Sequence, residues 1–231
     1  KNISQTFFYK KNSPTIVKKR FVDHINNNKI LGVYEINDEL INIYDQNKIE
    51  KKLIKLKGKI DLIIVSDYGH GFISEKTAKN ITKTCNFTCL NAQLNAANLG
   101  MHTINKYNNI STVVINEMEL RQEMRNRNSE IKKLMKNMTK KMKLKNLIVT
   151  RGANGSILYD RVGNNYLECP GFASKIVDKI GAGDAMLAII SIALKIGLDK
   201  RLSLLLGSLA AAQSVESIGN SISVDKDKML K

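Results

Sequence analysis

Apolar residues recur along the chain with two different periods. Runs rich in β-branched residues, which are typical of buried strands, occupy residues 61–66, 112–115 and 146–150. Between them, apolar side chains recur every three or four residues, as on one face of a helix, at residues 41–56 and 131–142. This alternation is typical of α/β proteins, so we expect a layered fold with a mostly parallel sheet between helices.

The first part of the chain has a different pattern. Residues 14–34 predict two strands around the asparagines at 26–28, and we assign residues 1–36 to part of a small β lid. Residues 37–231 are expected to form one layered domain, because the chain has two prolines, no Ser/Gly-rich linker and no internal repeat. In such folds, ligands bind beyond the carboxyl ends of the strands.

The formal net charge of +16 raises nucleic-acid binding as an alternative function. However, the lysines are spread through residues 48–59 and 132–145 between apolar residues, as on solvated helix faces. Aromatic residues, on which bases stack, make up only 6% of the chain. We therefore expect no nucleic-acid partner; a steeply salt-dependent affinity for DNA or RNA would be the signature of that alternative.

Cysteine number and apolar run length indicate the compartment. The three cysteines form neither a disulfide framework nor the two pairs of a zinc site. No uninterrupted apolar run is long enough to cross a bilayer, and residues 1–10 lack the pattern of a secretory signal. We therefore expect a cytoplasmic protein with no membrane partner.

Residues 178–184 carry the strongest chemical signal. They read DKIGAGD and continue directly into an apolar stretch at 185–190 that is expected to be helical. The first N–H groups of a helix lack intrahelical partners and carry the positive end of the helix dipole, so this turn is expected to bind anions. The spacing leaves two interpretations of Asp184 open: it caps the helix, or it accepts the proton of a hydroxyl that attacks phosphorus.

The same segment resembles the D-T-x-G-A-G-D signature of the PfkB family of carbohydrate kinases, also called the ribokinase family, with Lys179 in place of threonine. The resemblance implies that Asp184 is the catalytic base. It also implies a backbone anion hole formed by Gly181, Ala182 and Gly183. The implied cofactors are ATP and Mg²⁺, the implied substrate is a sugar or sugar phosphate, and the implied fold is ribokinase-like with a small β lid.

Two further motifs occur upstream in the family's order. Asn116 and Glu119 form an N-x-x-E pattern that resembles the motif organising magnesium and phosphates through water. The segment TRGANG resembles the T-x-G-x-x-G segment that lines the nucleotide pocket, which implies nucleotide contacts from Thr150, Gly152 and Gly155.

The resemblance also implies magnesium ligands at Asp178 and Glu119, together with a monovalent cation. Downstream, the small residues at 207–213 look like the helix that packs beside the adenine, which implies Ser208 as an adenine neighbour. The alternative is that these small side chains only pack the helix closely against the sheet.

Within the family, two segments resemble the kinase domain of bifunctional heptose-phosphate kinases. Residues 14–22 resemble a strand of their substrate lid, and VSDYGHG at residues 65–71 resembles their S-D-Y-x-x-G turn. Those relatives carry a D-P-K-like turn where this chain reads NAQLNAANLG at residues 91–100. The amides there either read sugar hydroxyls or serve as turn and cap residues, and the sequence leaves both interpretations open.

The family pattern opens with a strand and a glycine- and asparagine-rich sugar-binding segment that do not precede Lys1, so we expect a fold that is incomplete at its N-terminus. The leading hypothesis is an ATP-dependent carbohydrate kinase. The alternative is a catalytically weak or inactive nucleotide- or sugar-binding module that needs a missing segment or a partner. A homodimer formed through the β lid is a further expectation.

Overall fold

The computed structural model of the chain describes residues 2–23, 29–93, 103–178, 180–217 and 221–229. The asparagines at 26–28, the amide-rich run at 94–100 and Lys179 lie outside the described residues. The elements follow in this order: β1 (Val17–Val22), β2 (Lys29–Glu35), α1 (Ile43–Leu56), β3 (Ile63–Asp67), α2 (Glu75–Thr84), β4 (Thr88–Ala92), η1 (Ile104–Lys106), β5 (Thr112–Asn116), α3 (Glu117–Glu123), α4 (Ile131–Met142), β6 (Asn146–Thr150), η2 (Gly152–Asn154), β7 (Ser156–Asp160), β8 (Asn165–Cys169), α5 (Ala182–Lys195), α6 (Lys200–Val215) and α7 (Lys226–Met229).

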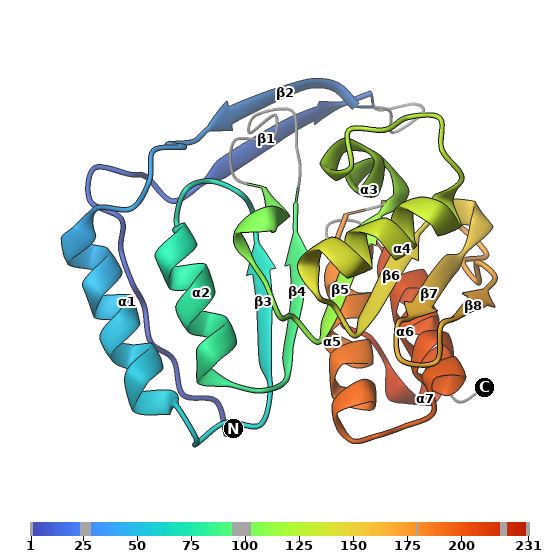
Figure 1. Cartoon of the computed structure of the whole chain (residues 1–231). Helices are drawn as coiled ribbons and strands as arrows, with labels where there is room; N and C mark the ends of the chain where they lie inside the picture. Colours follow the sequence, from blue (N-terminus) through green and yellow to red (C-terminus); the bar gives the residue numbers. More distant parts are fainter. Residues whose placement is uncertain (1, 24–28, 94–102, 179, 218–220, 230–231) are drawn as a thin grey trace.

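The main sheet has six strands in the order β3-β4-β5-β6-β7-β8 (Figure 1). The pairs from β3 to β6 are parallel, and β7 and β8 add antiparallel pairs. The expected mostly parallel sheet is therefore confirmed. The carboxyl ends of β3, β4, β5 and β6 all lie at one edge, which is where ligands bind in such folds.

Helices cover both faces of this sheet, and alternating strand residues supply two cores. Val113 and Ile115 point into one core, together with residues of α2, α3 and α4. Val114 points into the other, where it meets Met186, Leu187 and further residues of α5 and α6. Because successive residues of β5 point into different cores, the sheet is buried between two helical layers.

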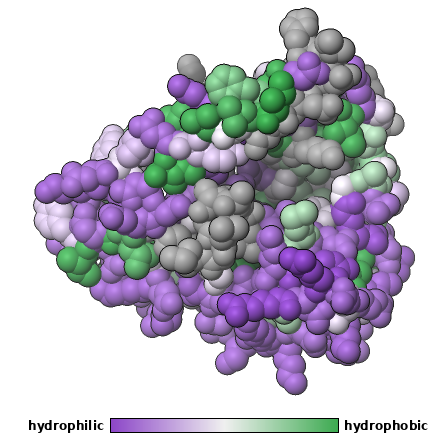
Figure 2. Space-filling model, turned by 90° about the horizontal axis from the view of Figure 1, so that it is seen from above, coloured by the Kyte–Doolittle hydropathy of each residue, from purple (hydrophilic) through white to green (hydrophobic). Residues whose placement is uncertain are grey.

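The lid is a separate two-stranded antiparallel sheet, β1 with β2, that lies above the carboxyl ends of β3 and β4 (Figure 1). Lys18 pairs with Tyr34 and Lys19 pairs with Val33, so these two pairs occupy opposite faces of the lid. Figure 2 looks down on the molecule from above and shows apolar patches that interrupt a mostly hydrophilic surface.

β3 lies at the end of the sheet in the part of the chain that the structure describes. Ile64 of this strand is 41% exposed, although strands of a parallel sheet are usually covered on both faces. Across the described ranges, no helix has both the length and the apolar character needed to span a bilayer.

Candidate active site

The glycine turn, residues 181–183, forms the amino end of α5. Gly181 is the N-cap residue with φ 87°, a backbone conformation that favours glycine, and no side chain caps the helix there. A Cβ atom built on Gly183 would meet the Nδ2 atom of Asn91 at 3.9 Å and no closer atom of the described residues. The described residues therefore leave room around Gly183, and the first N–H groups of such a helix favour an anion.

Asp184 lies in the first turn of α5 and contacts the end of β3. Its Oδ1 atom accepts a hydrogen bond from the hydroxyl of Ser66, at 2.9 Å. The sequence analysis quoted Ser66 only as part of a turn motif and missed this contact, which joins residues 118 positions apart. Asp184 is thus a carboxylate at the positive end of a helix that already accepts a hydrogen bond from a hydroxyl.

Asn116 and Glu119 form a capping box at the start of α3. The Asn116 side chain accepts from the Glu119 N–H at 2.8 Å, and Glu119 Oε2 accepts from the Asn116 N–H at 2.9 Å. Asn116 is also the register neighbour of Thr150, so the ends of two motifs lie side by side at the carboxyl edge of β5 and β6. The N-x-x-E spacing therefore has a local structural reason in addition to its implied role.

Gly155 is required by the close approach of another segment. Its φ is 75°, and a Cβ atom there would lie 2.0 Å from the Cys169 carbonyl oxygen and 2.6 Å from the Pro170 carbonyl carbon. Gly152 also has a positive φ, 58°, but a Cβ atom there would meet nothing within 4 Å. The two glycines of this motif therefore differ sharply in how much space surrounds them.

Ser208 lies on α6 with its side chain almost buried, and its hydroxyl is 3.0 Å from the hydroxyl of Ser156 on β7. The preceding residue, Gly207, faces α5, where a Cβ atom would lie 3.2 Å from Met186 Cγ and 3.3 Å from Ile190 Cβ. These small residues allow close packing of α6 against both α5 and the sheet. The adenine contact of Ser208 stays a prediction.

The two residues predicted to bind magnesium each have local hydrogen bonds. Asp178 Oδ1 accepts from the Ile180 N–H at 3.1 Å, and Glu119 holds the capping box. Among the described residues, no three His, Cys, Asp or Glu side chains gather as a metal site. A Mg²⁺ ion here would therefore take most of its oxygen ligands from phosphates and water, as this ion commonly does.

A buried cluster fixes the turn that follows β3. Asp67 is only 3% exposed and binds the Tyr107 hydroxyl at 2.8 Å, the Lys106 ammonium at 2.6 Å and the Gly69 N–H at 2.9 Å. Burial, and then the charge of Asp67, raise the pKa of Tyr107, so its hydroxyl stays protonated and donates. The sequence analysis gave Asp67 no role, because two of its three partners, Lys106 and Tyr107, lie about 40 residues further along the chain.

Comparison with known proteins decides the family. Residues 8–227 match the family model described as "pfkB family carbohydrate kinase". The chain belongs to the pfkB family. It is 23% identical over 218 residues to the bifunctional protein HldE of Nitratiruptor sp., an alignment that covers 93% of this chain and 45% of that protein.

Solved structures of pfkB-type kinases support the same fold. Phosphofructokinase-2 from Escherichia coli in complex with potassium has a TM-score of 0.69 at 15% identity, covering 87% of this chain and 65% of that one. Ribokinase from Arabidopsis thaliana complexed with ribose and ATP has a TM-score of 0.65 at 18% identity, covering 95% and 68%. The chain spans about half the length of the curated relatives it matches. The expected ribokinase-like fold is confirmed.

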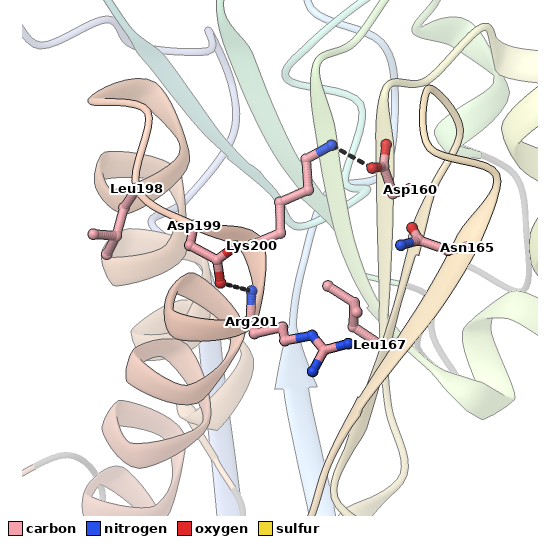
Figure 3. A pocket seen from close by; sticks show the side chains of 7 residues that line it. All are labelled: Asp160, Asn165, Leu167, Leu198, Asp199, Lys200 and Arg201. Carbon is pink, nitrogen blue, oxygen red and sulfur yellow. Dashed lines mark hydrogen bonds and ion pairs between the residues drawn. The ribbon is translucent and has the colours of Figure 1, made fainter.

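A hollow lies at the opposite edge of this pfkB fold and is separate from the candidate site. It has a volume of about 360 Å³, and Figure 3 shows its side chains, contributed by β7, β8 and α6 with the turn before that helix. Asp160, which lines it, pairs with Asn146 at the start of β6. The hollow therefore lies at the amino ends of the parallel strands, away from Asp184. Its lining residues are Asp160, Asn165, Leu167, Leu198, Asp199, Lys200 and Arg201.

One ion pair in this hollow gives a pH-dependent prediction. Burial alone would raise the pKa of Asp160, but the Lys200 ammonium at 2.6 Å and the backbone N–H groups of Gly163 and Val162 hold it below its usual range. We expect Lys200→Met to reduce the free energy of unfolding by about 1–2 kcal/mol at pH 7, a value discounted because Lys200 is partly exposed. Urea unfolding of both proteins measures it.

The sign of the pH effect follows from the lowered pKa of Asp160. The pair stabilises the fold above the unfolded-state pKa, about 3.9, and its contribution is lost as the pH falls through the lower folded-state pKa. The difference between wild type and Lys200→Met should therefore shrink towards pH 3. Lys136→Met, at an exposed position on α4, is the control. An equal difference at pH 7 and pH 3 would contradict the assignment.

Proposed function

We propose that this chain transfers a phosphoryl group from ATP to a hydroxyl of a sugar that itself carries a phosphate, as heptose phosphates do. The observation that carries the proposal is the position of Asp184. It lies at the open amino end of α5 and accepts a hydrogen bond from a hydroxyl at 2.9 Å. A sugar hydroxyl in a similar position would donate to the same carboxylate.

In the proposed reaction, Asp184 accepts the proton of the sugar hydroxyl as the hydroxyl oxygen attacks phosphorus. The N–H groups at the amino end of α5 would bind the transferred phosphoryl group and stabilise its negative charge. ATP with Mg²⁺ supplies the phosphoryl group when bound. The protein contributes position and electrostatics, which account for most of the catalysis in phosphoryl transfer.

We place the nucleotide along the carboxyl ends of β5 and β6. Asn116 and Thr150 are register neighbours there, and their position supports the proposal. Glu119 and Asp178 would reach Mg²⁺ through water, because each carboxylate already accepts a backbone N–H. The proposal adds a monovalent cation near the glycine turn. The remaining proposed nucleotide contacts are Gly152, Gly155 and Ser208.

The positive charges on the inner face of the lid favour a phosphorylated sugar as the substrate. Lys18 and Arg20 alternate along β1 and so share one face, and the Lys18 ammonium lies 5.6 Å from the centre of the Tyr68 ring at the end of β3. Burial, and then the charge of Arg20, hold the pKa of Lys18 below its ordinary value. Two cations that face the carboxyl edge of the sheet would attract a sugar phosphate.

ADP release with a panel of sugars tests the function. We expect turnover with a heptose phosphate and little with the unphosphorylated heptose. Lys18→Ala should raise KM for the phosphorylated sugar about tenfold, since a charge-assisted hydrogen bond is lost, and should leave kcat nearly unchanged. Lys136→Ala, at an exposed position on α4, is the control. Equal turnover of both heptoses would contradict the proposal that the substrate must carry a phosphate.

We further propose a homodimer through the outer face of the lid. Phe21 pairs with Leu31 on this face, Val33 lies beside Leu31 along β2, and these three side chains are 50–54% exposed. Such an exposed apolar group is typical of an interface, and a second copy of the lid offers the same surface in return. Sedimentation measures the resulting mass.

The expected cytoplasmic location is part of the proposal. The chain has three cysteines, and Cys85, Cys89 and Cys169 are buried free thiols. Burial raises the pKa of Cys89 to about 11, so this thiol stays protonated. Unpaired, unreactive thiols agree with a reducing compartment.

A further inference from the structure

Two polar side chains from neighbouring strands lie beneath the amino end of α5. Ser66 of β3 and Asn91 of β4 are direct register partners, so their side chains are neighbours on one face of the sheet. Ser66 contacts Asp184, and Asn91 is the nearest side chain to the space in front of Gly183. We call Ser66 and Asn91 the polar pair.

Among the described residues, the Asn91 side chain is hydrogen-bonded through its amide nitrogen only. Its Nδ2 atom donates to the Val114 carbonyl oxygen at 2.8 Å. The ladder between β4 and β5 contains only the pairs Cys89 with Thr112 and Leu90 with Val113, so the Asn91 side chain bridges the two strands where the ladder ends. Its orientation is fixed, because the Val114 carbonyl needs a donor and only the nitrogen of the amide provides one.

Among the described residues, the oxygen of this amide has no hydrogen-bond partner, although Asn91 is only 6% exposed. A buried acceptor without a donor costs stability. An apolar side chain of similar size would avoid that cost but would leave the Val114 carbonyl without its donor. Asn91 therefore combines a structural contact, the bridge to Val114, with an unused acceptor close to Gly183.

The Ser66 hydroxyl donates a hydrogen bond to one oxygen of the Asp184 carboxylate. The contact is 2.9 Å long and involves Oδ1. A carboxylate in the first turn of a helix can turn about its χ angles, and one fixed oxygen removes most of that freedom. The second oxygen then keeps one direction, which is what a proton acceptor near an incoming hydroxyl requires.

We propose that Ser66 and Asn91 are positioning residues: Ser66 orients the Asp184 carboxylate, and Asn91 supports the backbone at Gly183 across the gap between β4 and β5. The inference rests on the proposed kinase function, because it assigns how that site is held in place. It predicts losses in kcat with little change in substrate affinity, since neither side chain is assigned a contact with the sugar or the nucleotide.

Ser66→Ala tests the first half of the inference. We expect kcat to fall about 10- to 100-fold, the range for a lost hydrogen bond to a charged group, while KM changes less than about twofold. Ser66→Thr keeps the hydroxyl and should restore most of kcat. Thr82→Ala, which removes an exposed hydroxyl hydrogen bond on α2, is the matched control and should behave as wild type.

Asn91→Leu tests the second half. We expect kcat to fall about tenfold. The midpoint of thermal unfolding should fall by no more than about 5 °C, because removal of the unpaired amide oxygen offsets part of the cost of leaving the Val114 carbonyl without its donor. A large fall in the midpoint with unchanged kcat would show a purely structural residue and would overturn this half.

Amide hydrogen exchange without any ligand separates this inference from the proposed function. Both variants should speed exchange of the Ala185 N–H, which donates to the Gly181 carbonyl at 2.9 Å in the first turn of α5, relative to the rest of the helix. If wild type turned over no sugar, the proposed function would fail, and the exchange result would still decide the inference. Exchange and kcat equal to wild type in Ser66→Ala would overturn it.

Discussion

Asp184→Asn is expected to lower kcat by about 10²- to 10⁴-fold, the range assigned to a positioned general base. Asparagine keeps the size of the side chain and can still bond to the Ser66 hydroxyl, but it cannot accept a proton at neutral pH. The glycine turn is unchanged, so nucleotide affinity should stay nearly the same. ADP release measures kcat, and calorimetry with a non-hydrolysable ATP analogue measures affinity.

Asp199 provides the matched control for this substitution. It also lies at the amino end of a helix, where its carboxylate accepts the Arg201 and Leu202 N–H groups at the start of α6. Asn caps helices about as well as Asp, so Asp199→Asn should retain wild-type turnover. If Asp184→Asn turned over as fast as wild type, Asp184 would be a helix cap only.

Gly155→Ala should be the most destabilising single change considered for this chain, with an expected loss of about 3–5 kcal/mol in the free energy of unfolding. The new Cβ atom would lie 2.0 Å from the Cys169 carbonyl oxygen, and its neighbours are backbone atoms that cannot swing away. The backbone of Gly155, with φ 75° and ψ −136°, adds strain of about 1–3 kcal/mol for any residue with a side chain. Urea unfolding measures the loss.

Gly152→Ala separates the two causes. Gly152 also has a positive φ, 58°, but open space around a new Cβ atom, so backbone strain of about 1–2 kcal/mol is the only cost there. Both glycines were predicted to line the nucleotide pocket, so a nucleotide-binding role alone would not distinguish their stabilities. Equal losses in the two variants would show that the close approach of the segment after β8 contributes nothing.

Elements with strong periodicity were predicted well from the sequence. The helix expected at residues 131–142 is α4 (Ile131–Met142), and the strand expected at residues 146–150 is β6 (Asn146–Thr150). α4 has a buried apolar stripe and β6 has a buried apolar run, and these are the patterns from which elements are predicted. The antiparallel strands β7 and β8 were not identified, because their segment was read for its glycine motif and not for its alternation.

The sequence predicted which site residues come together where those residues are close in the chain. The glycine turn and Asp184 are contiguous, and Asn116 and Glu119 are one helical turn apart, so spacing alone brings each group together. The contact between Ser66 and Asp184 depends on how β3 and α5 meet in the fold. No local pattern contains that information, and only the folded chain reveals the polar pair.

In the part of the chain that the structure describes, the outer side of β3 pairs with no strand, which has a practical consequence for handling the protein. This strand reads IIVSD, without the lysine or proline that commonly protects the outer strand of a sheet. Ile64 adds an exposed apolar side chain beside its open backbone groups. At high concentration, such a strand can template intermolecular β-pairing, so light scattering and amyloid-dye binding should be followed across a dilution series before any measured mass is attributed to an ordered assembly.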